Sequence, residues 1–222
     1  VTTGYCVDLT SATINLRDNL TALTAAHLSV GRVTFDIKKN SGSFAAPANG
    51  EVSIAGAVVS IHPDKIGVGN HELRFTYTDN NTCVQTSSAV AIVVHALPDP
   101  NFTGLSAEYC VDNGLVTFVP RNGTTVINDL NNVTYSINTN SGGWVDNPGS
   151  INVNVGANTV TFNPATAGVG THQIRFTYTD VNGCVKISTP ETTVIHALPQ
   201  PAFTIAGNIT AYCRDAASPA LT

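Results

Sequence analysis

The chain has 222 residues, of which only 11% are charged, and its formal net charge is −5. The ten Lys and Arg residues are scattered, so the composition argues against a nucleic-acid-binding surface. No apolar run approaches the roughly 20 residues that a membrane span needs, and no signal peptide is recognisable. Thr, Asn, Ser and Gly are abundant, and a surface of small neutral polar groups is typical of extracellular β-domains.

An internal repeat organises the sequence. The stretch 67–84 returns at 168–185, and ten of its first thirteen residues are identical in the two copies. A shorter pattern, Tyr-Cys-x-Asp, occurs three times, at 5–8, 109–112 and 212–215. A fixed long period is the mark of repeat architecture. We therefore expect one module at 1–97, a second at 98–198 and the opening of a truncated third at 199–222, and we expect the chain to be a piece of a longer protein.

Alternating apolar residues predict the strands, most clearly in the second module. In chain order these strands are 116–119, 133–137, 151–155, 159–162, 172–179 and 185–196. Turn signals rich in Gly, Asn and Pro separate them. About seven short strands per module, with no helical period, predict an all-β fold of tandem antiparallel sandwiches of the immunoglobulin type. We expect Ile174, Phe176 and Tyr178, on one face of the strand 172–179, to fill the core.

The end of this strand carries the most specific pattern. The residues Thr-Tyr-Thr-Asp-Val-Asn-Gly-Cys at 177–184 precede a Thr-rich last strand. This pattern resembles the PKD-like and immunoglobulin-like tandem repeats of large cell-surface proteins of Bacteroidota, including gliding-motility adhesins. The resemblance covers both modules and implies an extracellular protein, type IX secretion and outer-membrane attachment through regions outside this sequence. It says little about a ligand, because such modules serve as spacers, adhesive heads and enzyme appendages.

Five cysteines are distributed over the repeats. We expect Cys6 to pair with Cys83, and Cys110 with Cys184, because each pair would join the first strand of a module to the start of its last. Cys213 would then be unpaired. In the alternative, staggered pairing, Cys83 bonds Cys110 and Cys184 bonds Cys213, which requires one module to fold back across the linker. A closed loop of more than 70 residues is worth roughly 4 kcal/mol, and either pairing implies an oxidising compartment.

The linkers repeat a stiff pattern. Two prolines one residue apart favour an extended backbone, so we expect a short, rigid joint and a semi-rigid rod. We expect the leucine before the first proline to pack against the neighbouring module, although a freely hinged joint with a solvated leucine is the alternative. The linker residues are Leu97, Pro98 and Pro100, and then Leu198, Pro199 and Pro201.

Metal and catalytic sites have weak support. Two histidine pairs recur, but two imidazoles alone do not complete a zinc site. We therefore interpret these residues as hydrogen-bonded histidines at strand ends and not as metal ligands. The turns that begin at Asp79 and Asp180 offer oxygen ligands for calcium, yet Asp and Asn are also what a tight turn requires. We expect no cofactor, with calcium as the minor alternative. No nucleophile elbow or recurring carboxylate pair is present, so we expect no catalysis. The histidine pairs are His71 with His95, and His172 with His196.

Two functions remain. One is the semi-rigid stalk or filament of a large bacterial cell-surface adhesin, whose partners are neighbouring modules, other stalk copies, surface polysaccharide or outer-membrane proteins. The other is an array of carbohydrate- or protein-binding modules that use loop residues near Trp144. Sugar-binding faces need exposed Trp or Tyr rings. Trp144 is the single tryptophan and Phe44 takes its place in module one, which favours the stalk and leaves Trp144 and Phe44 as candidate ligand contacts.

Overall fold

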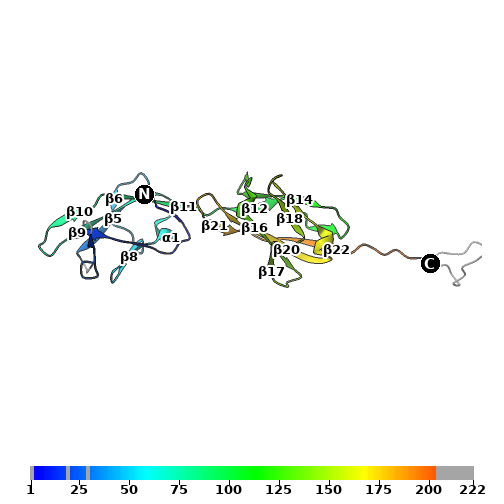
Figure 1. The fold of residues 1–222 in the computed structure, drawn as a ribbon, viewed down its shortest axis with the longest axis horizontal. Helices are drawn as coiled ribbons and strands as arrows, with labels where there is room; N and C mark the ends of the chain where they lie inside the picture. The colour runs from blue at the N-terminus through cyan, green and yellow to red at the C-terminus, as the bar shows by residue number, and fades with distance from the viewer. Residues whose placement is uncertain (1–2, 19–20, 29–30, 204–222) are drawn as a thin grey trace, which may run out of the picture.

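The computed structural model describes residues 3–18, 21–28 and 31–203, and their regular structure is almost entirely β-strand. Each sheet draws its strands either from residues 3–95 or from residues 100–196, and we call these two parts unit 1 and unit 2. Figure 1 shows them end to end, with the linker between. The fold is all-β, as predicted. The predicted opening of a third module, with Cys213, lies outside the described residues except for 199–203.

Unit 1 is a sandwich of two sheets. One sheet has the order β1-β11-β9-β5-β6, with β10 on β9, and in it β1 runs parallel to β11. The other has the order β2-β8-β7, and β3 and β4 form a separate two-stranded hairpin. The elements are β1 Thr3–Cys6, β2 Ala12–Ile14, β3 Arg17–Asp18, β4 Thr21–Ala22, β5 Val33–Lys39, β6 Phe44–Ala45, β7 Val52–Ala55, β8 Val58–Ile61, α1 Pro63–Ile66, β9 Gly69–Thr78, β10 Val84–Thr86 and β11 Val90–His95.

Unit 2 repeats this plan and adds a strand, β12, at its start. One sheet has the order β13-β22-β20-β16-β17, with β21 on β20, and the other has the order β12-β14-β19-β18, with β15 on β14. The elements are β12 Pro100–Thr103, β13 Glu108–Cys110, β14 Val116–Asn122, β15 Thr125–Val126, η1 Leu130–Asn132, β16 Val133–Thr139, β17 Trp144–Asp146, β18 Ile151–Asn154, β19 Thr159–Phe162, α2 Pro164–Ala167, β20 Gly170–Thr179, β21 Val185–Ile187 and β22 Glu191–His196.

The two sheets of unit 2 enclose one continuous core. As predicted from the alternation in β20, Ile174 and Phe176 are fully buried, and Tyr178 packs half-buried against the same cluster. Aromatic rings form its centre. The centroid of the Tyr135 ring lies 5.6 Å from that of Phe118 and 5.6 Å from that of Phe176. In unit 1 the buried residues fall into two smaller clusters.

The strand predicted at 185–196 is two strands. β21 and β22 are separated at residues 188–190. β21 pairs with the end of β20, at 177–179, and β22 pairs with its start, at 170–174. Ser188 is buried at this break, and its Oγ accepts a hydrogen bond from the backbone N–H of Phe176. Period-2 alternation continues through such a break, so the sequence pattern alone did not reveal it.

Candidate functional site at the joint between the units

A disulfide joins the two units. Cys6 at the end of β1 bonds Cys184, which follows the turn after β20, with a Cα–Cα distance of 5.5 Å and a sequence separation of 178. Cys83 and Cys110 are free and exposed. This connectivity corrects the predicted pairs Cys6–Cys83 and Cys110–Cys184, and it also differs from the staggered alternative. The cross-link lies between modules rather than within one.

The strand register explains why the predicted pairs do not form. Cys6 lies opposite His95, and the start of β9 at Gly69 lies beside that same end of β11. β9 then runs ten residues to Thr78, on the order of 30 Å away. Cys83 follows the turn after Thr78, so it lies at the opposite pole of unit 1 from Cys6. Disulfides need Cα atoms roughly 4.4–6.8 Å apart, and the expectation that the two cysteines lie at one end of the sandwich is wrong.

The turn that carries Cys184 is held by Asp180. One carboxylate oxygen of Asp180 accepts hydrogen bonds from the backbone N–H groups of Asn182, at 2.9 Å, and Cys184, at 2.8 Å. The backbone N–H of Asp180 donates to the carbonyl of Cys184 at 2.9 Å. Asp79 makes the same two side-chain contacts in unit 1, with Asn81 and Cys83. These carboxylates therefore hold the cysteine loops in place. They act as turn residues, the alternative to calcium ligands.

The linker belongs to unit 2. Pro100 opens β12 and is buried, and Pro98 before it is also buried. Asp99 fixes the segment to unit 2 through its backbone: its N–H donates to Asn122 Oδ1 at 2.7 Å, and its carbonyl accepts from Gly123 N at 2.7 Å. A backbone bonded in this way does not hinge freely. Leu97 is half-buried.

The second copy of the linker has a different environment. Leu198 is 44% exposed, and Pro199 and Pro201 are exposed too. The residues against which Leu198 was expected to pack lie outside those described. The same linker sequence is thus buried where it enters a unit and exposed beyond unit 2, at the end of the described chain.

Trp144 and Phe44, the candidate ligand contacts, are each stacked with an arginine of their own unit. The guanidinium carbon of Arg175 lies 3.8 Å from the centroid of the Trp144 ring, and that of Arg74 lies 4.1 Å from the Phe44 ring. Such cation–π contacts are worth about 0.5–1 kcal/mol at exposed sites. One face of each half-buried ring is therefore already occupied, so that face does not stack with a ligand.

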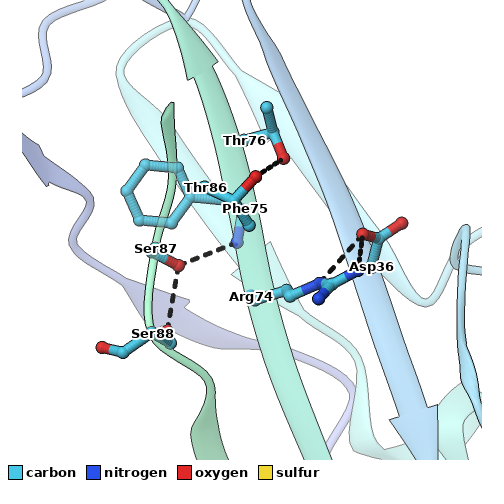
Figure 2. A network of polar contacts seen from close by, with 7 residues as sticks. All are labelled: Asp36, Arg74, Phe75, Thr76, Thr86, Ser87 and Ser88. Carbon is cyan, nitrogen blue, oxygen red and sulfur yellow. Dashed lines mark hydrogen bonds and ion pairs between the residues drawn. The ribbon is translucent and has the colours of Figure 1, made fainter. Parts of the chain in front are cut away.

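Arg74 also belongs to a polar network on β9, shown in Figure 2. It donates to Asp36 of β5 through Nε and Nη2, at 3.0 and 2.9 Å. The backbone N–H of Phe75 donates to Ser87 Oγ at 3.1 Å, and Ser87 Oγ donates to the carbonyl of Ser88 at 3.0 Å. These contacts tie Ser87, which follows β10, to β9, and they join β9 to β5.

Ser188 repeats the Ser87 contact in unit 2, where it is buried. We expect Ser188→Ala to destabilise unit 2 by about 1–3 kcal/mol, because the buried N–H of Phe176 loses its side-chain acceptor. Urea unfolding followed by the fluorescence of Trp144, which reports on unit 2 alone, measures this change. The exposed neighbour Thr189→Ala is the control and should stay within about 0.5 kcal/mol of the parent. Equal effects of the two substitutions would contradict the assignment.

The recurring histidines support the sandwich. His71 and His172 are buried, and each ring Nε2 lies 2.9 Å from the carbonyl oxygen of the glycine that ends the preceding helix. His172 Nδ1 also lies 3.0 Å from Thr139 Oγ1. His196 approaches Glu108 at 3.5 Å instead of meeting His172. Within residues 3–18, 21–28 and 31–203, no group of three His, Cys, Asp or Glu side chains is placed to hold a metal ion.

The Tyr178 side chain lies near the joint on β20. Its pKa is raised, first by burial and then by the carboxylates of Asp180 and Asp129.

In the described part of the chain, no helix is long and apolar enough to cross a membrane.

Comparison with known proteins identifies no family for this chain. No protein-family profile and no curated protein sequence matches the chain. Among solved structures, murine CEACAM1b is 13% identical with a TM-score of 0.35, and 88% of this chain and 96% of that chain are covered. Fibronectin(III)-like modules of Clostridium thermocellum CbhA are 12% identical with a TM-score of 0.37, covering 88% and 89%. A marsupial T cell receptor is 8% identical with a TM-score of 0.47, covering 92% and 74%.

Proposed function

We propose that this chain is part of the non-catalytic, semi-rigid stalk of a large bacterial cell-surface adhesin, with modules at 1–97 and 98–198 as its repeating segments. The observation that carries the proposal is the Cys6–Cys184 disulfide, which ties one unit to the next. A cross-link between units adds little to the core of either unit. Its mechanical effect is to keep their relative orientation when the chain is pulled or bent, which is the requirement of a stalk.

The buried linker supports the same role. Covalent continuity through Pro98 and Pro100 and the disulfide give two attachments between the units, and two attachments restrict rotation that one would permit. An extracellular location agrees with the disulfide, because such bonds persist in oxidising compartments. Secretion by the type IX route and a role in gliding rest on the sequence resemblance alone.

Scattering from the chain in solution tests the stalk. We expect the double variant Pro98→Gly/Pro100→Gly, studied under reducing conditions, to broaden the distribution of distances between the units while each unit stays folded. The matched control is Pro199→Gly/Pro201→Gly, which changes the exposed copy of the linker and should leave the distribution unchanged. A parent chain whose units already reorient freely would overturn the proposal.

The alternative function is an array of carbohydrate-binding modules. A shallow polar hollow of about 370 Å³ on unit 2, lined by Asn152, Asn154 and Thr161 among others, could accept hydroxyl groups. No aromatic ring lines it in the described residues, and the Trp144 ring is stacked with Arg175. Glycan-array binding that disappears in Trp144→Ala or Asn152→Ala would favour this alternative over the stalk.

A further inference from the structure

One sheet face of unit 2 carries an arginine that lacks the acidic partner of its copy in unit 1. Arg74 and Arg175 occupy the same place in the repeat. Arg74 donates two hydrogen bonds to Asp36, which lies opposite it on β5 (Figure 2). The residue opposite Arg175 on β16 is Ser136, and a serine hydroxyl has no charge. The carboxylate that neutralises the arginine in unit 1 is therefore missing from this place in unit 2.

No other group in the described part of the chain replaces Asp36 as a partner of Arg175. The Nε atom of Arg175 is buried without a hydrogen-bond partner, and the side chain forms no ion pair with the described residues. Its guanidinium carbon lies 3.8 Å from the centroid of the Trp144 ring, a contact that holds the side chain without accepting its hydrogen bonds. A charged donor without acceptors is unfavourable. Because the side chain as a whole is only half-buried, a ligand anion can reach Arg175 and supply an acceptor.

Asp146 lies on the same face but bonds Ser136 instead of Arg175. The register places Asp146 of the edge strand β17 opposite Ser136, and Ser136 Oγ donates to Asp146 Oδ1 at 2.6 Å. Asp146 is exposed, so its carboxylate can also accept a hydrogen bond from a ligand. The face therefore offers a cationic donor and an anionic acceptor on either side of Ser136.

Neutral amides complete this face in unit 2. Asn138 lies opposite Gln173, two residues further along the same pair of strands. Their copies in unit 1 are Lys38 and Glu72, whose side chains form an ion pair at 2.7 Å. Ion pairs between its own strands thus satisfy the charges on this face of unit 1. In unit 2 the same positions present uncharged groups that can bond a ligand hydroxyl.

We propose that this face of unit 2 binds an acidic polysaccharide through the carboxylate of a uronic acid residue. The ligand carboxylate accepts hydrogen bonds from the guanidinium of Arg175 and takes the place that Asp36 fills in unit 1. Guanidinium and carboxylate form strong, charge-assisted hydrogen bonds. Hydroxyl groups of the same ligand bond Asp146, Asn138 and Gln173. A sugar acid presents a carboxylate and hydroxyl donors on one ring, whereas an acidic side chain of a peptide presents the carboxylate alone.

The site goes beyond the stalk role and does not depend on it, because none of its residues belongs to the joint between the units. It is also distinct from the polar hollow on β18 and β19, which lies on the other sheet of unit 2. Only one of the two units carries it, so it predicts a single specialised module and not an array of equal ones.

Isothermal titration calorimetry of the purified chain with polygalacturonate, alginate and hyaluronate tests the proposal. The net charge of −5 repels a polyanion at long range, so binding reports a local site. We expect at least one of the three to bind. For polygalacturonate, the fully methyl-esterified polymer has the same sugar without the charge and should bind at least about tenfold more weakly. Failure of all three glycans to bind, or equal binding of the esterified polymer, would overturn the proposal. Equal binding of poly-glutamate would do so too, and would assign the face to an acidic peptide.

Two substitutions in unit 2 locate the binding, and circular dichroism checks that each variant is folded. Arg175→Gln removes the charge, and Ser136→Asp gives unit 2 the carboxylate that occupies the arginine in unit 1. Each should weaken glycan binding at least about tenfold. The matched control is Arg74→Gln, which removes the same charge from unit 1 and should bind like the parent. Equal losses in Arg74→Gln and Arg175→Gln would show an effect of net charge alone and would overturn the site.

Asn152→Ala separates this site from the polar hollow, which Asn152 lines. We expect it to bind acidic glycans like the parent. Binding that Asn152→Ala abolishes and Arg175→Gln leaves intact would place the ligand in the hollow and overturn the proposal. Scattering from Arg175→Gln should match that of the parent whatever the glycan result, because the joint is unchanged. A failure of the ligand site is therefore distinguishable from a failure of the stalk.

Discussion

Phe102→Ala should destabilise unit 2 by about 3–5 kcal/mol, the usual cost of removing a buried phenylalanine side chain. Phe102 contacts two rings at the centre of the core, and it lies on the strand that reaches unit 2 from the linker. The urea midpoint of unit 2, followed by Trp144 fluorescence, should therefore fall by at least about 1 M. Unit 1, followed by circular dichroism, should unfold as before.

Phe203→Ala is the matched control for this prediction. The two phenylalanines occupy the same place in the repeat, but Phe203 is largely exposed and Phe102 is buried. A monomeric chain with Phe203→Ala should unfold at the parental midpoint. If Phe102→Ala were as harmless as Phe203→Ala, β12 would contribute nothing to the stability of unit 2.

The fold could be predicted because its signals are local. The alternation in β20, from His172 to Thr179, places Ile174 and Phe176 on one face whatever lies around the strand. The turn after it is set by Asp180, whose carboxylate bonds two backbone N–H groups within four residues. Both features depend on neighbours along the chain, so a single sequence is enough to find them.

The joint could not be predicted in the same way. The partner of Cys6 depends on which pole of the sandwich each strand end reaches, and on how one unit meets the next. Neither fact is local. The linker prolines predict a stiff, extended joint, but not that the part from Pro100 is a strand of unit 2. A usable signal was present, because the repeat continues through Phe102 and Phe203, and a spacer has no need of a recurring aromatic residue.

Breaking the Cys6–Cys184 disulfide should loosen the joint and leave both units folded. Each unit has its own sheets and its own buried clusters, so its core does not depend on the cross-link. For Cys6→Ser we expect scattering to show a broader distribution of distances between the units. The urea midpoint of unit 2, followed by Trp144 fluorescence, should stay close to the parental value. Cys83→Ser removes an exposed free thiol and should change neither measurement.

Peptide mapping without reduction decides between this connectivity and a disulfide within each unit. The peptide containing Cys6 should be recovered linked to that containing Cys184, and an alkylating reagent should modify Cys83 and Cys110 in the folded chain. A bond within each unit would close a loop of more than 70 residues, and its removal would cost that unit roughly 4 kcal/mol. A bond between units has no such effect on either one alone. Loss of unit stability in Cys6→Ser, or recovery of a Cys6–Cys83 peptide, would therefore contradict the joint and with it the mechanical argument for a stalk.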